Sequence, residues 1–263
     1  MAQPATPPGT GCETALESVM VLRDDYPMTH KNIVVLTGAG ISAESGVPTF
    51  RGADGLWDGH RLEDVATPEA FARDPALVQR FYNLRRAALT NVQPNAAHRA
   101  LAELAARWEG DFLLVTQNVD DLHDRAEIET PPAMGFELIH MHGELLKGRC
   151  TRTGVVSDWP GDMAADEPSP DHPEGRMRPH IVWFGETPLH MDRIEAALAK
   201  CDLFVSIGAS GAVWPAAGFV QLARRAGART VEINLEPSLG ASMFDDGVYG
   251  PATQAVPRFF GAL

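Results

Sequence analysis

Gly38-Ala39-Gly40-Ile41-Ser42-Ala43-Glu44-Ser45-Gly46-Val47-Pro48-Thr49-Phe50-Arg51 is the stretch that decides the fold. It follows the apolar run at residues 33–36, which predicts a buried strand. Glycines at the end of a strand allow a phosphate to approach backbone N–H groups. The first six residues also fit the Gly-x-Gly-x-x-Ala form of the dinucleotide fingerprint. The stretch therefore predicts a nucleotide site at the end of a strand.

The residues that follow the glycines argue against an ordinary hydride-transfer Rossmann unit. Such a unit continues through an uninterrupted helix to a second strand, which carries an acid about 20 residues further on. Here Gly46 and Pro48 break the helix early, and no second strand carries Asp58, which lies at about that distance. We therefore expect a nucleotide site covered by an unusual loop.

Composition limits the partners of the chain. The formal net charge is −13 over 263 residues, which argues against nucleic acid as the main partner. Residues 1–14 lack the pattern of a signal peptide, and no apolar run reaches membrane length, so we expect no membrane partner. Cys12, Cys150 and Cys201 are too few and too scattered for a disulfide framework, which favours a cytoplasmic location.

Strand-like runs alternate with helical patterns, which predicts an α/β fold with a mainly parallel, Rossmann-like sheet flanked by helices. The expected strands are at residues 33–36, 112–116, 136–141, 181–184, 203–207 and 230–234. We assign residues 29–51, 94–143 and 181–263 to this nucleotide-binding domain. Residues 52–93 and 144–180 interrupt the alternation, and we expect these two insertions to form a smaller module. Residues 1–28 are expected to be a disordered leader.

Polar side chains follow two of the expected strands. Gln117, Asn118 and Asp120 come directly after one strand, and they suit either a nucleotide's hydroxyl and carboxamide groups or the start of a helix. His140 and His142 end the next strand and share a face, so a metal pair has to be considered. No third ligand is obvious, and Gly143 beside His142 favours a general base in an open site.

Six motifs now occur in the order found in the sirtuins, and the resemblance that they carry covers the chain from residue 31 to about 260. They are residues 38–51, residues 116–120, His142-Gly143, Phe184-Gly185-Glu186, Gly208-Ala209-Ser210 and Asn234-Leu235-Glu236. The chain thus resembles the sirtuin family, and the number and order of the motifs make the resemblance specific.

The resemblance implies an NAD-dependent protein-lysine deacylase. His142 would be the base that activates a ribose hydroxyl after the acyl oxygen has displaced nicotinamide, and Asn118 would be its catalytic partner. The products would be deacylated lysine, nicotinamide and an O-acyl-ADP-ribose. Phe50 would shield the reactive sugar from water.

The resemblance also implies two sets of binding residues. The NAD set is Gly38, Ala39, Gly40, Ser42, Ala43, Phe50, Arg51, Gln117, Asn118, Asp120, Gly208, Ala209, Ser210, Asn234, Leu235, Glu236 and Ala252. The substrate set includes Val182, Trp183, Phe184, Gly185 and Glu186, which would form one edge for an acylated peptide while residues 211–213 form the other.

Tyr82 and Arg85 bear on the acyl group. At i, i+3 spacing they share one helix face, and a phenol with a guanidinium suits a carboxylate. The pair resembles the Tyr-x-x-Arg motif of the class III desuccinylase/demalonylase branch of sirtuins, which implies succinyl and malonyl substrates with weaker deacetylase activity. A helix face that simply points to water is the alternative.

The chain departs from most sirtuins in its cysteines. The family pattern has two Cys-x-x-Cys pairs for a structural zinc, but here only Cys150 stands in that region. His172 and His180 lack ligand spacing relative to Cys150, so we expect no structural zinc. A small apolar cluster would replace it, drawn from Val155, Val156, Trp159, Met163 and Met177.

Two other functions remain as alternatives at this point. One is an NAD-dependent mono-ADP-ribosyltransferase on the same scaffold, and the other is a non-catalytic sensor of NAD or ADP-ribose. The intact set of Asn118, Asp120 and His142 favours the enzymes over the sensor, and Tyr82 with Arg85 favours deacylation.

Overall fold

A six-stranded parallel sheet forms the centre of the molecule, in the order β11-β10-β9-β1-β4-β5. The computed structural model describes residues 31–49, 56–57, 59–130 and 136–263, without the side chains of residues 56 and 57. The strands of the sheet are β1 (Asn32–Thr37), β4 (Asp111–Thr116), β5 (Phe136–His140), β9 (Leu203–Ile207), β10 (Arg229–Asn234) and β11 (Asp246–Tyr249). The predicted α/β class and parallel sheet are confirmed.

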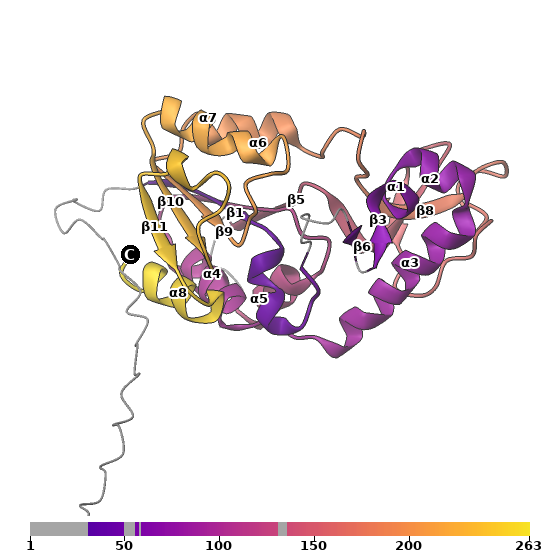
Figure 1. The fold of residues 1–263 in the computed structure, drawn as a ribbon, viewed down its shortest axis with the longest axis horizontal. Helices are drawn as coiled ribbons and strands as arrows, with labels where there is room; N and C mark the ends of the chain where they lie inside the picture. The colour runs from indigo at the N-terminus through magenta and orange to yellow at the C-terminus, as the bar shows by residue number, and fades with distance from the viewer. Residues whose placement is uncertain (1–30, 50–55, 58, 131–135) are drawn as a thin grey trace, which may run out of the picture.

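Helices cover both faces of the sheet, as Figure 1 shows. α4 (Ala96–Arg107) and α8 (Ala252–Phe260) pack on one face, with α5 (Leu122–Glu129) beside α4. α6 (Met191–Leu198) and α7 (Phe219–Arg225) pack on the other. In β1, Ile33 and Val35 belong to the first core and Val34 and Leu36 to the second. Burial on both faces explains why β1 is continuously apolar in sequence.

A smaller module lies at one end of the sheet (Figure 1). It contains β2 (Leu56–Trp57), β3 (His60–Arg61), α1 (Leu62–Val65), α2 (Pro68–Arg73), α3 (Pro75–Ala88) and an antiparallel sheet of β7 (Val156–Asp158), β6 (Gly143–Cys150) and β8 (Met177–Ile181). Short 3₁₀ turns complete the fold: η1 (Ala39–Ile41), η2 (Ala43–Ser45), η3 (Leu89–Asn91), η4 (Ala216–Gly218) and η5 (Ala241–Met243).

One predicted strand of the main sheet is wrong. Residues 181–184 were expected to be a strand of the parallel sheet, but β8 ends at Ile181 and pairs antiparallel with β6. Trp183 is buried in the core of the small module, together with Phe81 and Tyr82. The apolar run arises from this packing. The division into two domains stays a prediction, as does the leader over residues 1–28, which lies outside the described residues. Among the described helices, none is long and apolar enough to cross a bilayer.

Polar side chains of α3 form hydrogen bonds to the segment from β6 to β8, residues 143–181, which we call the ribbon. Asn83 exchanges two hydrogen bonds of 3.0 Å with Met163, because its amide donates to the carbonyl and its oxygen accepts from the N–H. One turn earlier, the amide of Gln79 donates to the carbonyl of Met177 at 3.1 Å. Arg86 donates to Asn83 at 2.7 Å and so fixes its orientation.

A small apolar cluster lies under these bonds. It contains Cys150, Met163 and Met177, with Trp159 packed against it. Val155 and Val156 were expected to join the cluster, but they are 46% and 41% exposed, so that part of the expectation is wrong.

The surroundings of Cys150 do not fit a tetrahedral zinc. Its sulfur accepts from the Arg152 N–H at 3.4 Å, and a Cβ at Gly175 would lie 2.7 Å from it. Among the described residues, no group of three potential ligands includes Cys150. The absence of a structural zinc here stays a prediction.

We expect Asn83→Ala to destabilise the protein by about 1–3 kcal/mol, because it leaves the N–H and carbonyl of Met163 without their partner. Denaturant unfolding followed by circular dichroism measures the change. Leu84→Ala on the same helix is the control: Leu84 is 71% exposed, and its loss should cost no more than about 0.5 kcal/mol. Equal unfolding midpoints for the two variants would contradict the role given to Asn83.

Candidate active site

A cavity of about 580 Å³ opens at the carboxyl ends of the central strands and extends to the small module. Its size is within the usual range for sites that bind small molecules and cofactors. Parallel sheets bind their ligands at this edge. Most of the predicted site residues line it: Gly38, Ala39, Gly40, Ala43, Tyr82, Arg85, Gln117, Asn118, Asp120, His142, Val182, Trp183, Phe184, Gly185, Glu186, Gly208, Ala209, Ser210, Asn234, Leu235 and Ala252.

The glycines after β1 allow two loops to touch. Gly38 donates its N–H to Ile207 and Gly40 donates to Gly208, both at 2.9 Å. A Cβ at Gly40 would lie 2.6 Å from the Cα of Gly208, and a Cβ at Gly38 would lie 2.8 Å from the Gly208 oxygen. These N–H groups were expected to face a phosphate. Here they join the loops that follow β1 and β9, and the joined loops form the floor of the cavity.

Ser42 supports the site from behind. It is fully buried, and its hydroxyl accepts from the side-chain amide of Asn118 at 3.0 Å. The same hydroxyl lies 3.4 Å from His98 Nε2, in a buried contact. Asn95 caps α4 and donates to the Ile41 carbonyl at 2.8 Å, which fixes the turn that carries Ser42. Sequence reasoning missed Asn95 and His98, although Asn95 was recognisable as a helix cap.

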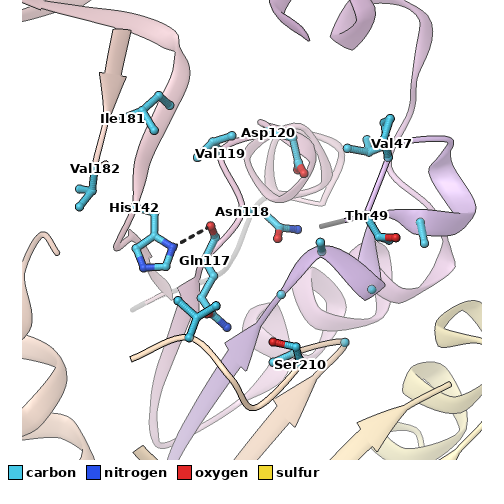
Figure 2. A pocket seen from close by; sticks show the side chains of 18 of the residues that line it. Val47, Thr49, Gln117, Asn118, Val119, Asp120, His142, Ile181, Val182 and Ser210 are labelled. Carbon is cyan, nitrogen blue, oxygen red and sulfur yellow. Dashed lines mark hydrogen bonds between the residues drawn. The ribbon is translucent and has the colours of Figure 1, made fainter. Parts of the chain in front are cut away.

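Asp120 and Gln117 flank Asn118 on the segment between β4 and α5. Asp120 is buried, and its carboxylate accepts from the Leu122 N–H at 3.2 Å. Burial raises the pKa of Asp120 to about 6. Figure 2 shows Asn118 and Asp120 on the same side of the cavity as Val47 and Thr49, with His142 on the other side of Gln117.

His142 is held in one tautomer. Its Nδ1 lies 3.2 Å from the Gln117 carbonyl, which only accepts, so Nδ1–H is the donor (Figure 2). Nε2 is then the basic nitrogen. Burial lowers the pKa of His142 below its ordinary value, and the bond to Gln117 offsets part of this effect. The imidazole is therefore neutral at neutral pH, with Nε2 able to accept a proton, and its role as a general base stays a prediction.

The small module supplies the other wall of the cavity. Trp183 donates its indole N–H to the Tyr82 hydroxyl at 2.9 Å, which places that hydroxyl in the role of a donor. Burial raises the pKa of Tyr82, so the phenol keeps its proton. Arg85, half-buried one turn later, also lines the cavity, and its guanidinium lies 5.2 Å from the centre of the Phe81 ring. The predicted pair thus reaches the cavity together.

Glu186 organises this wall instead of presenting a free carboxylate. It accepts two bonds from Arg178, at 2.7 and 3.0 Å, and one from Arg149 at 2.7 Å. It also accepts from the Trp183 N–H at 2.8 Å. Arg178 stacks on Trp183, with its guanidinium 3.3 Å from the ring centre. Sequence reasoning missed both arginines, because neither lies within a motif.

Two chain segments border the mouth of the cavity. Val182 donates its N–H to the His142 carbonyl at 2.9 Å, which joins His142 to the first of these segments, residues 182–186. Phe184 in that segment and Trp214 on the opposite loop are 48% and 70% exposed. The two expected edges for a peptide are thus brought to the same opening.

A few predicted residues are not on the cavity wall. Ser42 is buried behind Asn118, and Glu236 is exposed beyond Leu235. Phe50 and Arg51 lie outside the described residues, so the expectation that they cover the sugar stays a prediction. Asn234 lines the cavity and donates to the Ala209 carbonyl at 2.9 Å, which joins the loops that follow β10 and β9.

The sequence profile described as the Sir2 family matches residues 38–215. The chain belongs to the Sir2 family. An NAD-dependent protein deacylase of Salmonella typhimurium is 54% identical over 241 residues, covering 88% of this chain and 84% of that protein. One of Yersinia pseudotuberculosis is 56% identical over 236 residues, covering 86% and 80%. The solved structure of a Sir2 homologue in complex with NAD is 37% identical and covers 89% of this chain and 90% of that chain, with a TM-score of 0.79.

NAD is the co-substrate of Sir2 enzymes, and the cavity fits it. Gly208, Ala209 and Leu235 line the cavity on the side of β9 and β10. Another part of the cavity contains buried Asn118 and Asp120 beside the neutral His142, the donors and acceptors that a nicotinamide riboside requires. We therefore expect this Sir2 chain to hold NAD along the edge of the sheet.

We expect the imidazole of His142 to titrate below pH 6.5, because burial disfavours its charged form. A pH titration followed by imidazole ¹H–¹⁵N correlation spectra measures the midpoint, and the spectrum of His142→Asn assigns the signal. The neutral form should persist to lower pH than in a solvated histidine. A midpoint above 6.5 would show that a carboxylate, and not burial, governs this side chain.

Proposed function

We propose that this chain uses NAD to remove succinyl and malonyl groups from lysine side chains of proteins, with weaker action on acetyl groups. The broader activity, NAD-dependent protein-lysine deacylation, follows from membership of the Sir2 family and from relatives of that name at 54–56% identity. The acyl preference rests on the wall that the small module contributes.

The observation that carries the preference is the convergence of Tyr82 and Arg85 on the cavity that contains His142. A phenol fixed as a donor and a guanidinium together provide hydrogen bonds that a carboxylate can accept. The acetyl group offers no such acceptor at its end. Apolar side chains of the same cavity, those of Val119, Ile181 and Trp183, suit the methylene groups of a short acyl chain.

The local charge also favours an anionic acyl group. The chain as a whole has a net charge of −13, but the wall behind Trp183 brings together Arg178 and Arg149 with the single carboxylate of Glu186. Arg85 adds a further positive charge on the cavity side. A guanidinium at this end of the cavity carries the sign of charge that attracts succinyl and malonyl groups.

The remaining residues would have the roles that the resemblance to the sirtuins implies, and their positions support this. His142, with Nε2 as its basic nitrogen, would take the proton of a ribose hydroxyl, while Asn118 and Asp120 orient the nicotinamide ribose. The substrate lysine would enter between Val182–Glu186 and residues 211–213, with the peptide as an added strand. The products would be nicotinamide, deacylated lysine and an O-acyl-ADP-ribose.

A mono-ADP-ribosyltransferase or an NAD sensor remains the alternative, and turnover decides between them. Labelled ADP-ribose retained on protein would support the transferase, and no turnover of any acyl-lysine peptide would support the sensor. A cytoplasmic location is part of the proposal and rests on the few scattered cysteines.

We expect Arg85→Met to lower turnover of a succinyl-lysine peptide by about 10- to 100-fold, since a hydrogen bond to a charged group contributes about 1.5–3 kcal/mol. Turnover of the matching acetyl-lysine peptide should change little. Nicotinamide release with saturating NAD measures kcat/KM for each peptide. The value for the variant is then divided by the value for the unchanged protein.

Arg80→Met is the matched control, because Arg80 is exposed on the same helix and loses the same charge. It should leave kcat/KM for both peptides near the values of the unchanged protein. Equal losses for succinyl and acetyl peptides in Arg85→Met would rule out the carboxylate pocket, while leaving the broader deacylase activity intact.

A further inference from the structure

Three potential metal ligands meet on the far side of the segment that carries His142. Asp124 is in the first turn of α5, His140 is the last residue of β5 and Glu144 is near the start of β6. One ligand atom from each of them lies within 4.8 Å of the others. The sequence placed only His140 beside His142 and offered no third ligand. The fold instead turns His142 toward the cavity and brings two carboxylates to His140.

His140 and Asp124 form a close ion pair, and the distance between their two atoms also fits two ligands of one metal ion. Nε2 and Oδ2 are 3.0 Å apart, yet neither atom makes a hydrogen bond of acceptable geometry among the described residues. Two ligands at about 2.1 Å from one zinc ion are about 3.0–3.4 Å apart for angles between square and tetrahedral. The His140 side chain is only 9% exposed, so water does not replace a partner.

Lys147 is the cation that now neutralises Glu144. Its ammonium group lies 2.8 Å from Oε1 and 2.9 Å from Oε2 of Glu144. Lys147 is partly exposed and lies three residues after Glu144 on β6, so its side chain can move into solvent. An ion at this site would compete with Lys147 for Glu144.

We propose that Asp124, His140 and Glu144 bind one divalent transition-metal ion of the Zn²⁺ type. One imidazole nitrogen and two carboxylates form a donor set that suits borderline ions, and three protein ligands leave one position for water. The site is separate from the place where most sirtuins hold a structural zinc, since none of its ligands is near Cys150.

The position of this site gives it a connection to the cavity. α5 begins two residues after Asp120, and β6 begins one residue after His142. An ion held by Asp124 and Glu144 would join these two elements directly, through the residue that ends β5. Metal binding should therefore stabilise the fold around the proposed NAD site, and this can be measured without any catalytic turnover.

The test is a titration of the chelator-treated, full-length chain with ZnCl₂ by isothermal calorimetry, with the melting temperature measured in parallel. We expect one ion per chain and a rise in melting temperature with zinc concentration. Asp124→Asn and His140→Gln should each weaken binding by at least about tenfold, the loss that even changes outside the ligand set cause. Lys147→Met should tighten binding, because it removes the competing cation.

Two further variants serve as controls. Cys150→Ser and His172→Gln should bind zinc as the unchanged chain does, whereas loss of binding in Cys150→Ser would place the ion in the ribbon and overturn the proposal. Asp124 is half-exposed, so Asp124→Asn gives a folded test even where His140→Gln does not fold. Absence of saturable binding, or unchanged affinity in Asp124→Asn, would also overturn it.

Discussion

The contact between the loops after β1 and β9 is the constraint on which the site depends. Gly38 and Gly40 approach Gly208 more closely than any Cβ permits, and two backbone hydrogen bonds hold the loops together. This contact fixes the turn that carries Ser42, and Ser42 in turn holds Asn118. A side chain at any of the three glycines would separate the loops and displace both. The glycines therefore act first on protein packing, and a ligand benefits from the surface that results.

A second group of interactions sets the wall opposite this floor. Glu186 gathers Arg178, Arg149 and the N–H of Trp183, and Trp183 in turn bonds Tyr82. Asn83 and Gln79 bond the same helix to the ribbon. Among the described residues, hydrogen bonds and a small sulfur-rich cluster thus order this module.

Much of the fold could be predicted because the parallel strands are buried on both faces, which makes runs such as residues 33–36 and 203–207 visible in the sequence. The prediction of a sheet strand at residues 181–184 was wrong for the same reason. Trp183 is buried, but it packs against α3 in the small module and not in the parallel sheet. The place of a site residue was predictable where it lies in a motif, as at His142, which lines the cavity. Arg149, Arg178 and His98 were not, since each meets its partner only through the tertiary fold. Asp124 and Glu144 reach His140 in the same way.

The two contacts of Tyr82 limit how the acyl groups accepted by this protein could be changed by substitution. Its hydroxyl serves the cavity and also receives the indole N–H of Trp183, deep in the core of the small module. A phenylalanine there would remove the proposed acyl contact and would leave the buried indole N–H of Trp183 without its acceptor. The proposed acyl selectivity and the packing of the small module therefore depend on the same oxygen atom. Evolution or engineering toward neutral acyl groups has a second route through Arg85, which borders the cavity and takes no part in the bond between Tyr82 and Trp183.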